Sequence, residues 1–134
     1  SEVTTDNIEY KNINILLVED NSINQLLAQT VLKSVGFNVE TVENGLLALD
    51  ILIAKKMKFD LILMDIMMPI MNGYEASTKI RALDDDELNN IPIIALTADI
   101  TPKVRKKCNQ IGINTFISKP FNSRELNEII LNLL

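Results

Sequence analysis

Short apolar runs alternate along the chain with segments whose apolar residues recur at helical spacing. The runs are predicted strands and cover residues 14–18, 38–42, 61–64, 92–96 and 114–118. Most are continuous apolar stretches, without the alternation of apolar and polar positions that marks a half-exposed strand. The pattern is typical of parallel strands that are buried on both faces of a sheet.

The segments between these runs are predicted helices with recognisable ends. They cover residues 22–35, 44–52, 74–83, 102–111 and the stretch that follows Asn122. Gly36 and Gly112 are placed to end the first and the fourth helix. Thr101 followed by Pro102 is a start signal for the fourth helix.

Five strands alternating with five helices predict an α/β domain with a doubly wound five-stranded parallel sheet. The expected strand order is 2-1-3-4-5, the flavodoxin-like arrangement. Residues 1–12 are polar and aperiodic and are predicted to be a linker or tail, which leaves residues 13–134 as the domain. The acidic run at residues 84–87 is predicted to be a solvated loop.

The composition excludes several classes of function. The 134 residues carry a net charge of −5, which argues against direct binding to nucleic acid or to an anionic membrane surface. The chain contains no histidine, so imidazole bases and imidazole metal ligands are excluded. The single cysteine, Cys108, cannot form an internal disulfide, and no apolar stretch is long enough to span a bilayer. We therefore expect a cytoplasmic location without membrane contact by this domain.

Polar residues follow four of the predicted strands. Glu19 and Asp20 end the first strand, Asp65 the third, Thr97 the fourth, and Lys119 follows the fifth. In a parallel sheet these ends share one edge, where ligands bind. An all-oxygen ligand set favours a hard cation, Mg²⁺ in a cell.

These five residues indicate phosphoryl transfer only when they are taken together. Alone, Lys119 would be a surface lysine and Thr97 a strand-end hydroxyl. Together with the three carboxylates, they predict that Asp65 is the nucleophile that forms an acyl phosphate. Mg²⁺ and Lys119 would then neutralise charge on the phosphoryl group, and Thr97 would donate a hydrogen bond to it.

Four motifs, in order and at family spacing, resemble the receiver domains of two-component signalling. They are Val-Glu-Asp-Asn at 18–21, Leu-Met-Asp-Ile-Met-Met-Pro at 63–69 with Asn-Gly at 72–73, Ala-Leu-Thr-Ala at 95–98, and Lys-Pro-Phe at 119–121. The resemblance runs from about Asn14 to Leu134. It implies the receiver fold and a phosphorelay function, with a histidine kinase or a histidine phosphotransfer domain as the partner. It also implies that the domain is no enzyme acting on a separate substrate.

The resemblance implies a metal-binding role for four residues. Asp65 would be the phosphoacceptor and, with Asp20 and the backbone carbonyl of Met67, would bind Mg²⁺ directly. Glu19 would act mainly through water. Glu19 stands where many members of the family have aspartate, a change that is expected to keep metal binding.

The resemblance further implies a conformational switch. Thr97 would be the switch hydroxyl and Phe116 the switch aromatic, although an aromatic residue in a short strand is usually a core residue. Lys119 would contact the phosphate and precede a cis peptide to Pro120. The surface that changes would comprise helix 102–111, the fifth strand and the last helix, and the family also allows a weak homodimer through it.

Two helices carry candidate interaction surfaces. Helix 22–35 displays Ile23, Leu26, Leu27 and Val31, most of which are expected to face the sheet. The resemblance implies that this helix also docks the kinase or phosphotransfer partner. Helix 102–111 has four basic residues, which are interpreted first as a solvated face and second as a surface for an acidic partner.

Two rival functions are less consistent with the sequence. A haloacid-dehalogenase-like phosphatase needs a second aspartate two residues after the nucleophile, where this chain has Met67. A pseudo-receiver that only binds partners would lack part of the charged set. The run from Glu19 to Gln25 and the linker-like start are similar to receivers at the ends of hybrid sensor histidine kinases, and a free-standing regulator is the alternative.

Overall fold

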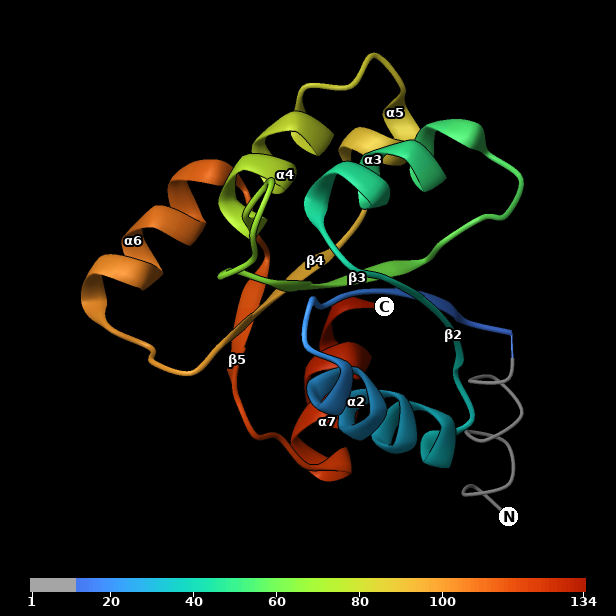
Figure 1. Cartoon of the computed structure of the whole chain (residues 1–134), viewed down its shortest axis with the longest axis vertical. Coiled ribbons are helices and arrows are strands. Elements are labelled where there is room, and N and C mark those ends of the chain that lie inside the picture. Colours follow the sequence, from blue (N-terminus) through green and yellow to red (C-terminus); the bar gives the residue numbers. More distant parts are fainter. Residues whose placement is uncertain (1–11) are drawn as a thin grey trace.

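Five parallel strands form one sheet in the order β2-β1-β3-β4-β5, as the sequence predicted (Figure 1). The computed structural model describes residues 12–134, so the predicted tail lies outside the described residues except for Asn12. The strands are β1 Asn14–Val18, β2 Asn38–Val42, β3 Leu61–Asp65, β4 Ile93–Thr97 and β5 Thr115–Ser118.

Helices cover both faces of this sheet. They are α2 Ser22–Val35, α3 Gly45–Ala54, α4 Gly73–Arg81, α5 Asp86–Asn89, α6 Pro102–Ile111 and α7 Ser123–Leu133. Figure 1 shows α2 and α7 on one face and α3, α4 and α6 on the other. Within residues 12–134, no helix has the length and apolar character needed to cross a membrane.

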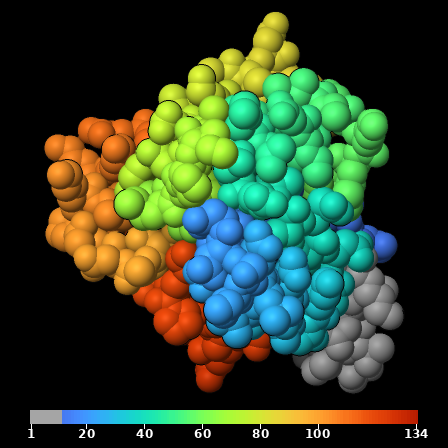
Figure 2. Space-filling model, in the orientation of Figure 1, coloured from blue at the N-terminus to red at the C-terminus, as the bar shows by residue number. Residues whose placement is uncertain are grey.

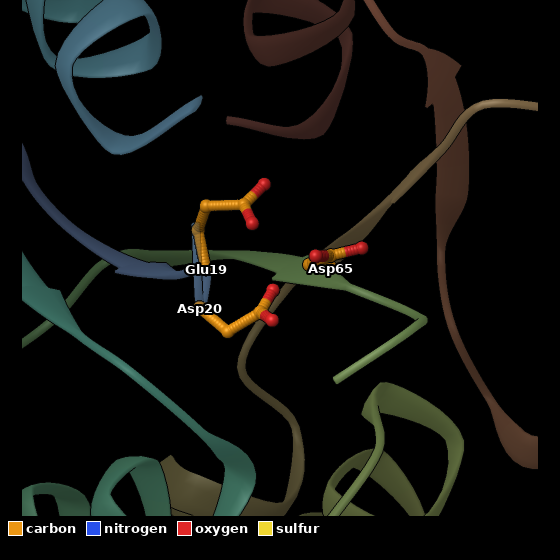
Figure 3. Close-up of side chains that lie close together, drawn as sticks. All are labelled: Glu19, Asp20 and Asp65. Atoms are coloured by element: carbon orange, nitrogen blue, oxygen red, sulfur yellow. The ribbon is translucent and has the colours of Figure 1, made fainter. Parts of the chain in front are cut away.

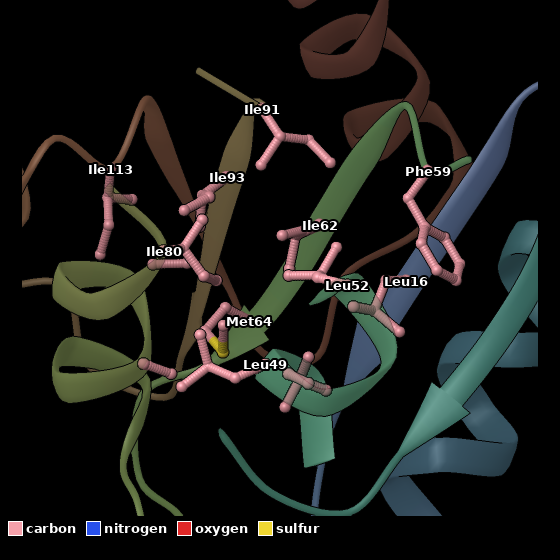
Figure 4. Close-up of a cluster of buried hydrophobic side chains, with 14 of the residues drawn as sticks. Leu16, Leu49, Leu52, Phe59, Ile62, Met64, Ile80, Ile91, Ile93 and Ile113 are labelled. Carbon is pink, nitrogen blue, oxygen red and sulfur yellow. The ribbon is translucent and has the colours of Figure 1, made fainter. Parts of the chain in front are cut away.

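The strand residues divide between two cores according to the face on which they lie. Leu16, Ile62 and Met64 are fully buried in the cluster beneath α3, α4 and α6 (Figure 4). Leu17 and Leu63 are fully buried in the cluster beneath α2 and α7. Because both faces are covered, every residue of β3 and β4 is buried, which explains their continuous apolar sequence.

The prediction of a solvated loop at residues 84–87 was wrong in part. Residues Asp86–Asn89 form the short helix α5, and the carboxylate of Asp85 caps it by accepting hydrogen bonds from the N–H groups of Glu87 and Leu88. Asp85 also forms an ion pair with Lys55. A capping aspartate satisfies backbone donors that a loop would leave to water, so a helical turn forms here.

The prediction that most apolar residues of α2 face the sheet was also wrong. Ile23, Leu26 and Leu27 are 68%, 64% and 58% exposed. The buried residues of α2 are Ala28 and Leu32, which lie four positions apart and therefore share a helix face. The remaining predicted helices and strands agree with the structure to within about two residues at their ends.

Candidate functional site

The three predicted acidic residues meet at the carboxyl ends of β1 and β3. Val18 and Met64 are register partners in these neighbouring strands, so the residues that follow them lie side by side. Figure 3 shows the carboxylates of Glu19, Asp20 and Asp65 close together. One oxygen from each carboxylate lies within 4.8 Å of the others. Glu19 and Asp65 are buried and Asp20 is exposed, so the group opens to solvent on one side.

The start of α2 holds Glu19 in place at the end of β1. The Asn21 side chain caps the helix by accepting hydrogen bonds from the N–H groups of Ile23 and Asn24, at 2.9 and 3.0 Å. The Asn21 N–H donates to the Glu19 carboxylate at 3.1 Å. The Gln25 side-chain amide donates to the Glu19 carbonyl at 2.7 Å. Both the backbone and the side chain of Glu19 are therefore held by the first turn of α2.

The segment between β3 and α4 packs tightly against Asp65. The N–H of Gly73 donates to the carbonyl of Ile66 at 2.9 Å, and a Cβ atom at Gly73 would lie 2.3 Å from the Asp65 carbonyl oxygen. Only glycine allows this approach. The Met67 N–H donates to Asp65 Oδ1 at 3.2 Å. The use of the Met67 carbonyl as a metal ligand stays a prediction.

Lys119 enters the acidic group from the end of β5. Its Nζ lies 3.0 Å from Glu19 Oε1 and 3.2 Å from Asp65 Oδ1, so one ammonium is shared by two buried carboxylates. Its backbone N–H donates to the Thr97 carbonyl at 2.8 Å, which joins it to the end of β4. The peptide bond from Lys119 to Pro120 is cis, as the sequence resemblance implied.

The crowding of these carboxylates changes their proton affinities in opposite directions. Burial and the neighbouring Glu19 raise the pKa of Asp65 to about 7, although Lys119 opposes the change. Burial alone would raise the pKa of Glu19, but hydrogen bonds from the Asn21 N–H, Asp65 and Lys119 outweigh burial and lower it. Burial favours the neutral form of Lys119, yet its two carboxylate partners raise its pKa overall. Of the two buried carboxylates, Asp65 therefore binds a proton more readily than Glu19.

The Thr97 hydroxyl forms hydrogen bonds with the backbone of Asp99, in the loop that follows β4. Its Oγ1 donates to the Asp99 carbonyl at 3.1 Å and accepts from the Asp99 N–H at 3.2 Å. Thr97 is buried at the same sheet edge as the acidic group, as predicted, and its described side-chain hydrogen bonds are made with Asp99 and not with Asp65.

Phe116 is half-buried on β5, where it packs against the core beneath α6. The guanidinium of Arg105 lies over its ring, with the carbon 4.9 Å from the ring centre. The sequence predicted neither this contact nor the hydrogen bond from the Gln25 side chain to the Glu19 carbonyl. The four basic residues of helix 102–111 were noted, but their spacing gave no sign of which one would reach a ring on another element.

A cavity of about 350 Å³ lies beside the acidic group. Leu27, Ala28 and Val31 of α2 form one side and Phe121 lies in its lining, with Lys119 among the few charged residues. Leu27, which lines the cavity, is also largely exposed, as is its neighbour in the chain, Leu26. Figure 2 shows the first part of α2, in blue, in the middle of one face of the molecule.

Comparison with known proteins points to one family. The family model described as the response regulator receiver domain matches residues 15–131. The hybrid signal transduction histidine kinase M of Dictyostelium discoideum is 44% identical over 121 residues, which cover 90% of this chain and 5% of that protein. The probable transcriptional regulator ycf29 of Porphyra purpurea is 43% identical, with 90% of this chain and 56% of that protein covered. The chain thus spans less than two thirds of either relative.

Solved structures of receiver proteins share the fold of this chain. The receiver domain of the sensor histidine kinase PA1611 of Pseudomonas aeruginosa, whose structure has a magnesium ion in the active site cleft, is 39% identical, with a TM-score of 0.79. The match covers 90% of this chain and 95% of that one. The chemotaxis protein CheY4 of Vibrio cholerae is 31% identical, with a TM-score of 0.80 and coverage of 91% and 98%.

Proposed function

This chain belongs to the response regulator receiver family and is a receiver domain of two-component signalling, and we propose that its Asp65 accepts a phosphoryl group from a partner's phosphohistidine. The observation that carries the proposal is the grouping of three carboxylates, with one oxygen of each within 4.8 Å of the others, beside an ammonium 3.2 Å from Asp65. Like charges held this close favour a bound cation.

The residues present fit Mg²⁺. The grouped carboxylates offer oxygen ligands, the kind that a hard cation prefers, and the exposed Asp20 leaves one side open for water and phosphate. We propose that Asp20, Asp65 and the Met67 carbonyl hold the ion directly and that Glu19 acts mainly through water. Mg²⁺ bound there would neutralise charge on the phosphoryl oxygens during transfer.

In the proposed step, a carboxylate oxygen of Asp65 attacks the phosphorus atom. The P–N bond of the phosphohistidine breaks, and its electron pair leaves with the imidazole, so that an acyl phosphate remains on Asp65. Lys119, already 3.2 Å from Asp65, would donate to the new phosphoryl oxygens.

The acyl phosphate would then shift a pre-existing balance between two states of the domain. The Thr97 hydroxyl would leave Asp99 and donate to a phosphoryl oxygen, and the Phe116 ring would move with it. Because the phosphoryl group binds one state better than the other, it increases the population of that state. The surface altered would be that of α6, β5 and α7, through which a weak homodimer is also proposed.

The proposed partner is a histidine kinase or a histidine phosphotransfer domain. The 134 residues contain no histidine, so the phosphohistidine comes from another domain. The exposed Ile23, Leu26 and Leu27, next to the cavity beside the site, offer an apolar surface on which a helix of the partner would dock. Two relatives are hybrid signal transduction histidine kinases, which supports a place for this domain within such a kinase. We also propose that the domain is cytoplasmic and that it acts on no separate substrate.

The proposal is tested by the intact mass of the protein after incubation with acetyl phosphate, with and without Mg²⁺. We expect one phosphoryl adduct in the wild type with Mg²⁺, no adduct in Asp65→Asn, and a normal adduct in the control Asp50→Asn, which removes an exposed carboxylate of α3. A folded wild type without any adduct would refute the phosphoacceptor role and favour a pseudo-receiver.

A further inference from the structure

Two cations of α6 lie over aromatic rings of neighbouring elements. The guanidinium carbon of Arg105 is 4.9 Å from the ring centre of Phe116 on β5, and Lys107 Nζ is 4.3 Å from that of Tyr74 in the first turn of α4. Both distances are within the range at which a cation is attracted to a ring. Lys106, between them, is exposed, and no ring contact of it is found in residues 12–134.

Arg105 contacts Phe116, the aromatic residue of β5, the strand that pairs with β4 and its Thr97. Phe116 is the register partner of Ala95, two residues before Thr97, and its side chain packs against the core beneath α6. Among the described residues, no carboxylate forms an ion pair with Arg105. The described contact of its guanidinium is therefore the Phe116 ring, and the attraction favours ring positions within its reach.

The Thr97 hydroxyl and the Phe116 ring are each held by a neighbouring group. The hydroxyl exchanges two hydrogen bonds with Asp99, on the loop that leads into α6, and makes no described bond to Asp65. The ring is half-buried and lies beneath the Arg105 side chain. Both features belong to one conformation, in which the hydroxyl is bonded to Asp99 and the ring lies under Arg105.

We propose that Arg105 is a positioning residue that favours this resting position of the Phe116 ring and so limits the fraction of domains ready for phosphorylation. The inference rests on the proposed roles of Asp65, Thr97 and Phe116. A cation over an exposed ring changes a two-state population about two- to five-fold. Arg105 touches neither metal nor phosphate in this scheme and acts only through the ring.

The test measures the rate of adduct formation with acetyl phosphate at saturating Mg²⁺, together with the Kd for Mg²⁺. We expect Arg105→Gln to be phosphorylated about two- to five-fold faster with an unchanged Kd, because more domains reach the competent state. Arg105→Lys keeps a cation and is expected to restore a rate near that of the wild type. Lys106→Gln removes the same charge from the next residue and is expected to match the wild type.

The sign of the effect separates the proposal from simpler explanations. Acetyl phosphate is an anion, so loss of a positive charge by itself would slow its approach. A rate in Arg105→Gln that is equal to or below that of the wild type would overturn the proposal, as would an equal acceleration in Lys106→Gln. Arg105→Met, a second neutral variant with an apolar stem, must show the same acceleration. Absence of an adduct in the wild type would instead refute the proposed function itself.

Discussion

Replacing Asp65 by asparagine is expected to stabilise the metal-free domain at neutral and alkaline pH. The Asp65 carboxylate is 3% exposed and grouped with those of Glu19 and Asp20, and its pKa is raised to about 7 by burial and by Glu19. The ionised form is therefore disfavoured in the folded state. Asparagine has nearly the same shape and no charge, so it removes this cost.

The size of the effect follows from the difference in pKa between the two states. In the unfolded chain Asp65 titrates near its ordinary value of 3.8, and in the folded domain near 7. Each pKa unit corresponds to about 1.4 kcal/mol, so the ionised carboxylate costs up to about 4 kcal/mol. An amide reproduces the protonated carboxyl imperfectly, and we expect Asp65→Asn to gain about 2 to 4 kcal/mol at about pH 8.

The difference in stability between Asp65→Asn and the wild type is expected to grow as the pH rises. Well below the unfolded pKa of 3.8, Asp65 is protonated in both states and its ionisation no longer contributes to the difference in stability between the two proteins. Between about pH 4 and pH 7 the folded wild type holds a proton that the unfolded chain has lost, so its stability falls as the pH rises. Above about pH 7 the difference from the variant is complete and constant.

The assay is urea unfolding followed by circular dichroism, in the presence of a chelator, over this pH range. Asp50→Asn serves as the control, because Asp50 is an exposed carboxylate on α3. Added Mg²⁺ should stabilise the wild type by mass action and Asp65→Asn much less. Equal stability of wild type and variant at about pH 8, or a difference that does not change with pH, would refute the reasoning.

Three further substitutions test the local geometry and the docking surface. Gly73→Ala would place a Cβ 2.3 Å from the Asp65 carbonyl oxygen. We expect the free energy of unfolding in urea to fall by about 1 to 3 kcal/mol and the phosphoryl adduct to form more slowly. A rate of adduct formation equal to that of the wild type would contradict the tight packing. Ile70 has a φ of 68° and is 77% exposed, so Ile70→Asn should raise stability by about 1 kcal/mol in thermal unfolding, whereas a loss would show that the side chain makes a needed contact. Leu26→Asp adds a charge to the proposed docking surface and should slow transfer from a phosphohistidine protein about tenfold relative to acetyl phosphate, with Ser34→Asp, near the other end of α2, as the control that should not.

The sequence predicted the sheet and the charged residues because each of these features is local. A buried parallel strand is a continuous apolar run, and the residue that follows it lies at the ligand-binding edge. Asp65, Thr97 and Lys119 could therefore be assigned to one edge without knowledge of any contact. The strand order, in contrast, came from the frequency of this fold at this length and not from the residues themselves.

The features that the sequence did not predict depend on contacts between elements. Helical spacing shows which residues of α2 share a face, but α2 has two apolar faces, and the face with Ala28 and Leu32 is the one that is buried. The smaller alanine allows a closer approach to the sheet than the leucines would. The contact of Arg105 with Phe116 likewise requires the path of α6 over β5, which no local pattern specifies.

The pairing of Glu19 with Lys119 has a consequence for how the protein matures. These residues are separated by 100 positions and meet only when β1 and β5 both occupy their places in the finished sheet. A chain in which β5 has not yet joined the sheet carries Glu19 and Asp65 but lacks the ammonium that these two residues share. Lys119 therefore reaches Glu19 and Asp65 only after β5 has joined the sheet, and a domain folded only as far as β4 would leave these two buried carboxylates without their cation.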